Sequence, residues 1–239
     1  MRPWPDRRHL MNPVLVVVLA LAAGLLSGLL TPMVLRRLAE PPTDGPESAT
    51  TEPSTVKIPY AQLATARFAA VVGLLAAATV GLSAGMLPLP VLPAWVVLGT
   101  VGLLLAAIDA RTTWLPLSLT RVAWVAMAVA LVLGSLLGGW SLGARGVGGF
   151  LVAGGLFWLI WRLTGGGFGF GDVRFAPLVG AATAGVSWTL LAWGLVLGSL
   201  TGAVVGLVRL TTRRRGAFAY APSILAGGYL ATALAWLTT

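Results

Sequence analysis

Asp109 and Asp172 are the only acidic residues after Glu52 in this 239-residue chain. Each lies where a long apolar run breaks, and Asp172 stands in the glycine-rich stretch GGGFGFGDVRF. Peptide hydrolysis by carboxyl groups needs two of them, because an ionised one takes a proton from water while a protonated one polarises the scissile carbonyl. The two aspartates are therefore the candidate catalytic pair.

Each aspartate also has a structural interpretation. Asp172 could cap a helix that begins near Val173. Asp109 ends a helical run, where the helix dipole disfavours a negative charge unless the helix continues or Arg111 compensates. Acidic residues close to a membrane interior are costly and usually functional, so the pair together favours a functional site.

Composition predicts an all-α, polytopic helical membrane protein. The chain is 57% hydrophobic and 10% charged, with a mean hydropathy of +0.91, and about 20 apolar residues suffice to cross a bilayer. We expect about eight transmembrane helices, at residues 13–35, 68–88, 92–109, 120–140, 146–163, 175–186, 188–209 and 220–237. The sixth is short and Gly-rich, so it could be a full crossing, a tight turn or part of a kinked segment.

The expected organisation has four parts: a basic N-terminal segment at 1–12, a first transmembrane helix at 13–35, a Pro-rich polar loop at 36–67 and a membrane-embedded core at 68–239. The first apolar run is too long for a signal-peptide h-region of about 7–15 residues, which predicts a retained helix. The polar stretch from Glu40 to Pro59 is predicted to be a flexible connector, with a substrate-docking loop as the alternative.

The formal charge of +9 favours a membrane surface over nucleic acid, because the basic residues lie at the ends of apolar runs. Most of them fall on the side of the predicted bundle that carries both aspartates, so the positive-inside rule predicts a cytoplasmic site in the cell membrane. The chain has no Cys and one His, His9, which argues against a Cys or His metal site.

The glycines before Asp172 predict a loop between two spans. Gly169 and Gly171 flank Phe170, and residues without a side chain let a peptide backbone approach closely.

Three stretches together resemble the type IV prepilin peptidases, which are membrane aspartic proteases. GFGFGDVRFAPLVGA is similar to the GxGD motif of that family. IDARTTWLPLSLT resembles its first catalytic motif, through Asp109, Leu115, Pro116, Leu119 and Thr120. FAYAPSILAGGYL resembles the start of its closing helix, with Pro222 in an aromatic-x-Pro context. The matches come in the family's order between Leu103 and Leu230.

The resemblance implies that Asp109 and Asp172 activate water to remove a short basic leader from prepilins or pseudopilins. It implies that Gly169 and Gly171 let the backbone position Asp172, and that Arg174 anchors a helix end to lipid headgroups. Proteolysis of this type needs no cofactor; S-adenosylmethionine would be needed only by a chain that also methylates its product. The chain has Leu117 where members often have an acidic residue and Arg174 where they often have Lys. Without cysteines it also lacks the zinc-binding loop of many larger members.

Three other interpretations stay open. A presenilin-type or signal-peptide-peptidase-type protease shares GxGD, but Ile108 precedes Asp109 where that group has Tyr. A proton-coupled transporter would use the two carboxyl groups at midmembrane. A non-catalytic scaffold of a pilus or secretion system would use them structurally.

Overall fold

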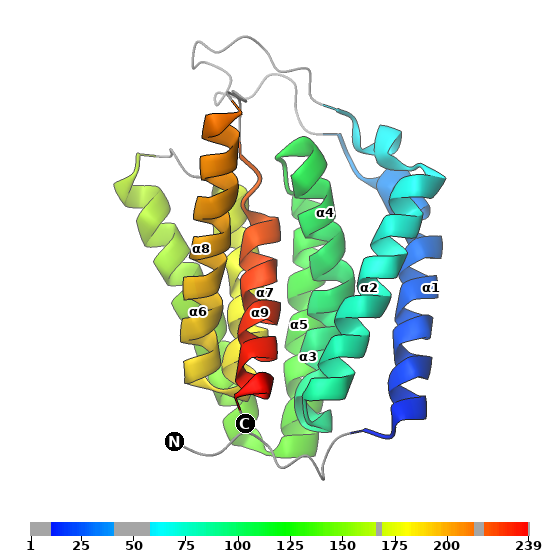
Figure 1. Cartoon of the computed structure of the whole chain (residues 1–239), viewed down its shortest axis with the longest axis vertical. Helices are drawn as coiled ribbons and strands as arrows, with labels where there is room; N and C mark the ends of the chain where they lie inside the picture. The colour runs from blue at the N-terminus through cyan, green and yellow to red at the C-terminus, as the bar shows by residue number, and fades with distance from the viewer. Residues whose placement is uncertain (1–10, 41–57, 166–168, 213–217, 239) are drawn as a thin grey trace.

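The computed structural model describes residues 11–40, 58–165, 169–212 and 218–238, and these form a bundle of roughly parallel and antiparallel helices (Figure 1). The helices are α1 (Pro13–Arg37), α2 (Ala66–Met86), α5 (Leu117–Gly138), α6 (Trp140–Leu163), α7 (Phe170–Val186), α8 (Trp188–Thr211) and α9 (Ala221–Leu237). One further rod, Leu89–Thr112, runs through the short helix η4 (Leu89–Val91), α3 (Leu92–Val97), a π-helical turn η5 (Leu98–Gly102) and α4 (Leu103–Thr112). A 3-10 turn, η3 (Tyr60–Leu63), precedes α2.

The prediction of a polytopic all-helical protein agrees with this architecture. Each of the eight predicted spans corresponds to a helical rod, and six of the rods in the described segments are long and apolar enough to cross a membrane. α7 and α9 are shorter, at 17 residues each. At about 1.5 Å per residue, 17 residues extend roughly 25 Å.

The prediction for the start of the fifth span was wrong. Residues 141–145 were expected to connect the fourth and fifth spans, whereas α6 already begins at Trp140. Gly139 has φ +90, a backbone conformation that glycine adopts without strain, and this lets α5 and α6 follow each other with a single-residue turn. Arg145 therefore lies within a helix, where its Nη2 donates a hydrogen bond to the carbonyl of Gly185 at 3.0 Å.

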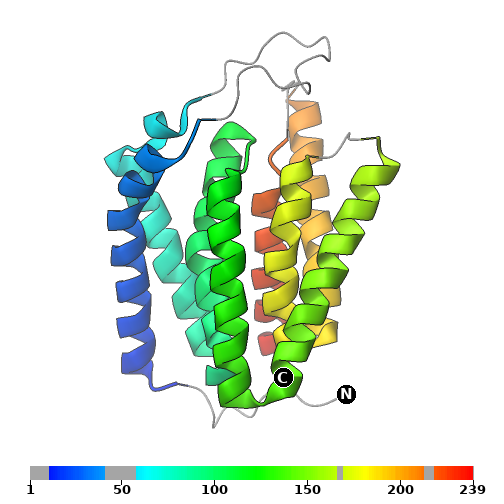
Figure 2. The ribbon, with the colours of Figure 1, turned by 180° about the vertical axis from the view of Figure 1, so that it is seen from behind.

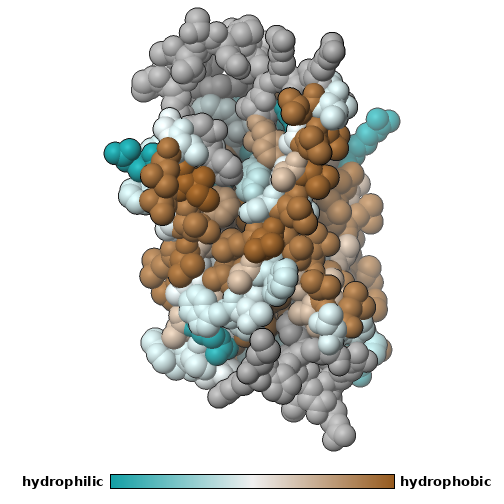
Figure 3. Space-filling model, turned by 60° about the vertical axis from the view of Figure 1, so that its left-hand side comes forward, coloured by the Kyte–Doolittle hydropathy of each residue, from teal (hydrophilic) through white to brown (hydrophobic). Residues whose placement is uncertain are grey.

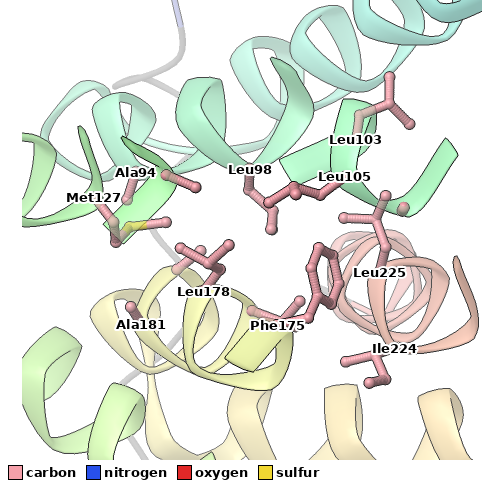
Figure 4. Close-up of a cluster of buried hydrophobic side chains, with 14 of the residues drawn as sticks. Ala94, Leu98, Leu103, Leu105, Met127, Phe175, Leu178, Ala181, Ile224 and Leu225 are labelled. Carbon is pink, nitrogen blue, oxygen red and sulfur yellow. The ribbon is translucent and has the colours of Figure 1, made fainter. Parts of the chain in front are cut away.

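The short sixth span forms a separate helix, α7, and is the most buried element of the bundle. It lies between α5, α6 and α9, as views from opposite sides show (Figures 1 and 2). Phe175 and Leu178 face Leu98 and Leu105 of the third rod in the hydrophobic core, and Leu225 of α9 lies beside Phe175 (Figure 4). Other helices thus enclose α7 along most of its length.

Glycine contacts bring α7 close to α6. A Cβ atom on Gly149 or on Gly180 would collide with the backbone carbonyl of the other residue. Small residues at such positions allow membrane helices to pack backbone to backbone, where dispersion contacts replace the hydrophobic effect as the main attraction.

The outer faces of the bundle are apolar. Val14, Leu21 and Leu29 of α1 are more than half exposed, as are Val125 and Leu136 of α5. Hydrophobic side chains cover much of the middle of the face in Figure 3, with hydrophilic residues toward its upper and lower parts. This distribution suits a protein surrounded by hydrocarbon and flanked by two polar interfaces.

Four features of the sequence analysis fall outside the described residues: most of the basic N-terminal segment (1–10), the Pro-rich stretch at 41–57, the glycines at 166–167 and the arginines at 213–215.

Candidate active site

Asp109 lies in the last turn of α4. The helix continues past it to Thr112 and ends where Thr113 adopts a left-handed conformation with φ 58. The helix dipole disfavours a negative charge at a helix end, and continuation of the helix past Asp109 reduces this cost. The side chain is 4% exposed, and its Oδ2 accepts a hydrogen bond from the backbone N–H of Ala221 at 3.2 Å. The start of α9 thus fixes one oxygen of this carboxyl group.

Asp172 lies in the first turn of α7, which begins at Phe170 after Gly169. The capping interpretation required a helix start near Val173, and it was wrong because the helix starts three residues earlier. Asp172 is 5% exposed. Its backbone N–H donates to the carbonyl of Gly169 at 3.0 Å. A carboxyl group in the first turn is favoured by the positive end of the helix dipole, which contributes to its placement.

The fold brings the two aspartates together. They lie 63 positions apart in sequence, yet the carboxyl groups are near enough to interact electrostatically. Asp109 is supplied by α4, Asp172 by α7, and the backbone donor by α9. The three sequence stretches singled out above therefore meet at one end of the bundle.

The two glycines of the motif matter because they have no side chain, and not because of unusual backbone angles. Gly169 has φ −62, and Gly171 lies inside α7. A Cβ atom on Gly171 would stand 3.1 Å from Leu115 Cδ1, and one on Gly169 would stand 3.3 Å from Asp172 Oδ2. Gly171 therefore allows the segment after Asp109 to pack on α7, and Gly169 leaves room beside the Asp172 carboxyl group.

Pro116 immediately precedes α5, and its carbonyl accepts hydrogen bonds from both the N–H and the hydroxyl of Thr120, each at 3.0 Å. Pro222 stands in the first turn of α9, where its fixed φ suits a helix start and no N–H is lost from the helix. Both prolines thus define helix starts at the end of the bundle that carries the aspartates.

Arg174 is half-buried, and its guanidinium lies over the ring of Phe170, 4.6 Å from the centroid. Its backbone carbonyl accepts a hydrogen bond from Trp124 Nε1 at 3.0 Å, which connects α5 to α7. Arg174 was expected to anchor a helix end to headgroups. The structure adds a cation–π contact that holds the first turn of α7.

Tyr60 was not identified from the sequence. It lies in η3, is 2% exposed, and its backbone N–H donates to Glu40 Oε2 at 3.2 Å. Burial raises the pKa of Tyr60 to about 12, with smaller contributions from the negative charges of Glu40 and Asp109. A phenol therefore lies within electrostatic reach of Asp109. No local signal could have revealed this, since the two residues lie 49 positions apart in the sequence.

In the segments that the structure describes, no three side chains of His, Cys, Asp or Glu gather into a group that could hold a metal ion. Comparisons with protein-family models, with curated proteins and with solved structures find no match to this chain.

Proposed function

We propose that this protein is a membrane aspartic endopeptidase that removes the short basic leader of type IV prepilin-like proteins at the cytoplasmic face of the cell membrane. The observation that carries the proposal is the pairing of Asp109 and Asp172, the only carboxyl groups after Glu52, in a buried site at one end of the bundle. The resemblance of three sequence stretches to the prepilin peptidases supplies the substrate class.

The proposed reaction is hydrolysis of one peptide bond. The ionised carboxyl group takes a proton from a water molecule as the water oxygen attacks the carbonyl carbon, and the protonated carboxyl group donates its proton to the carbonyl oxygen. The tetrahedral intermediate then returns a hydroxyl proton to the carboxylate that had donated one, the C–N bond breaks, and the departing amine receives the proton taken from water. The products are the leader with a new carboxylate and the mature protein with a new amino terminus.

The proposal is favoured over a transporter by the position of the pair. Asp109 is in the last turn of its helix and Asp172 is in the first turn of its own, so both lie near a helix end rather than at midmembrane. A leader peptide that precedes an apolar helix would lie at this level of the bilayer. A scaffold role would not require two carboxyl groups to lie together.

The test is cleavage of a prepilin by membranes that carry the wild-type chain, Asp109→Asn or Asp172→Asn, read by mass as loss of the leader. We expect each substitution to reduce cleavage at least a thousandfold, since both carboxyl groups act in every turnover. Asp6→Asn makes the same chemical change outside both motifs and should leave cleavage unchanged. Cleavage that survives both aspartate substitutions would contradict the mechanism.

A further inference from the structure

An apolar groove of about 480 Å³ lies on the side of the bundle, where α2 and α9 form its walls and α4 forms its floor. In Figure 1, α4 is set between α9 and α2, which border it on either side. Each helix contributes residues at the spacing i, i+3, i+4 and i+7: Leu75 to Leu82 on α2, Leu103 to Ala110 on α4, and Pro222 to Tyr229 on α9. This spacing places each set on one face of its helix.

The upper end of the groove adjoins the aspartate pair. Ala110 lines the groove and directly follows Asp109, while Pro222 lines it and directly follows Ala221, the residue that donates its N–H to Asp109. On the part of the chain that the structure describes, three other apolar grooves lie against α1, α3 and α5, between α1 and α2, and between α5 and α6. None of these three is lined by a chain neighbour of either aspartate.

The shape of the groove fits a helix. Seven residues of rise, at about 1.5 Å each, give the groove a length of roughly 10 Å, or two helical turns, parallel to the bundle axis. Small side chains line much of it: Ala78, Ala106, Ala107, Ala110 and Ala226. Small residues let the backbone of another helix approach closely in a membrane.

The polar groups of the groove lie near its lower end, beside the apolar Leu82 and Leu103. Thr79 and Tyr229 line this end, and the hydroxyls of Ser83 and Thr79 lie beside the buried Tyr229 hydroxyl. Thr79 Oγ1 is directed to carbonyl groups, including that of Gly99 in the π-helical turn at 3.2 Å. The apolar lining therefore runs along the length of the groove up to the residues that adjoin the aspartates.

We propose that this groove receives the apolar helix of the substrate, so that the peptide just ahead of that helix reaches Asp109 and Asp172. The inference rests on the proposed function and assigns the docking surface for the same reaction. An apolar helix matches the lining, the direction and the end point of the groove. The substrate's helix would then start beside Pro222 and run down toward Tyr229.

Because the chain contains no cysteine, single cysteines can test the proposal directly. One variant carries Ala226→Cys in the proposed groove, and the control carries Ala70→Cys in the groove between α1 and α2. Each is combined with Asp172→Asn and then mixed with a prepilin that carries one cysteine in the first two turns of its apolar helix. Under oxidising conditions we expect a disulfide-linked complex with Ala226→Cys at least tenfold above that with Ala70→Cys. Equal linking at both positions, or linking at Ala70→Cys alone, would overturn the proposal.

A blocking substitution separates this inference from the proposed function. With both aspartates present, Ala107→Trp should slow cleavage of the prepilin at least tenfold, whereas Ala70→Trp should not. If the wild-type chain cleaves no prepilin, the proposed function fails. A different result would overturn the docking proposal alone: the wild-type chain cleaves prepilin, Ala226→Cys forms no disulfide-linked complex, and Ala107→Trp cleaves at the wild-type rate. In that case the proteolytic function stands, and the groove holds a lipid chain or nothing.

Discussion

Asp109 and Asp172 are held in different ways at the residue scale. The Asp109 carboxyl group is fixed from outside its own helix, by the N–H of Ala221. Asp172 is positioned by the first turn of its own helix, with Gly169 leaving space beside Oδ2. Two carboxyl groups in different environments are suited to carry one proton between them, which is the state that aspartic proteolysis requires.

This arrangement predicts a bell-shaped dependence of cleavage on pH. Activity should fall at low pH, where both carboxyl groups are protonated, and again at high pH, where both are ionised. The pKa of Tyr60 is raised to about 12, so its phenol stays neutral at the pH values where the two carboxyl groups titrate. Tyr60→Phe should therefore keep both limbs of the profile, measured on a prepilin substrate.

The ring of Tyr60 is buried, and Phe preserves its apolar part, so the variant is expected to fold. Loss of the alkaline limb in Tyr60→Phe would show that the phenol, and not the second carboxyl group, titrates there. A flat profile in the folded wild-type protein would count against the shared-proton pair itself.

At the scale of the helices, close packing of α6 on α7 positions Asp172. α7 holds Asp172 at one end and is buried along most of its length. Gly149 and Gly180 set its distance from α6, because a side chain on either would collide with the backbone of the other helix. The position of Asp172 therefore depends on glycines about two to three helical turns away.

Gly149→Val should destabilise the protein by about 2 kcal/mol or more, because overpacking of a tight contact forces the backbone to move. Gly155→Val is the matched control, since it lies on the same helix and a Cβ atom there meets nothing within 4 Å. Thermal unfolding in detergent measures both. We expect a lower midpoint for Gly149→Val alone, and equal midpoints would show that α6 and α7 are not held by this contact.

The two ends of the bundle differ at the scale of the whole molecule. The aspartates lie at the end where α4, α6 and α8 finish and where α5, α7 and α9 begin. Arg36, Arg37, Arg111, Arg162 and Arg209 lie in the last turns of helices that finish at this end. By the positive-inside rule, this end faces the cytoplasm in our proposal.

Single cysteines also test this orientation. A membrane-impermeant maleimide added to intact cells should label Thr238→Cys, which lies at the opposite end, but not Thr164→Cys or Thr212→Cys; all three positions are exposed. Opening the cells should expose the latter two to the reagent. The reverse pattern would place the aspartates on the outer side, where a cytoplasmic leader could not reach them.

The sequence by itself determined the helical membrane class, the approximate spans and the two aspartates. These depend on local properties: apolar runs of sufficient length, and the rarity of carboxyl groups among them. It misplaced the start of α6 because a tight turn at Gly139 takes only one residue. It also misplaced the start of α7, where a helix begins among glycines that have poor helix propensity but are held by packing.

Only the tertiary structure decided which groups surround the aspartates. Three features each bring together residues that are far apart in the chain: the hydrogen bond from Ala221 to Asp109, the electrostatic interaction between Tyr60 and Asp109, and the groove between α2, α4 and α9. Such contacts depend on how helix faces pair, and small residues permit many pairings in a membrane. The two aspartates could be identified from the sequence, but the groups that lie beside them in the fold could not.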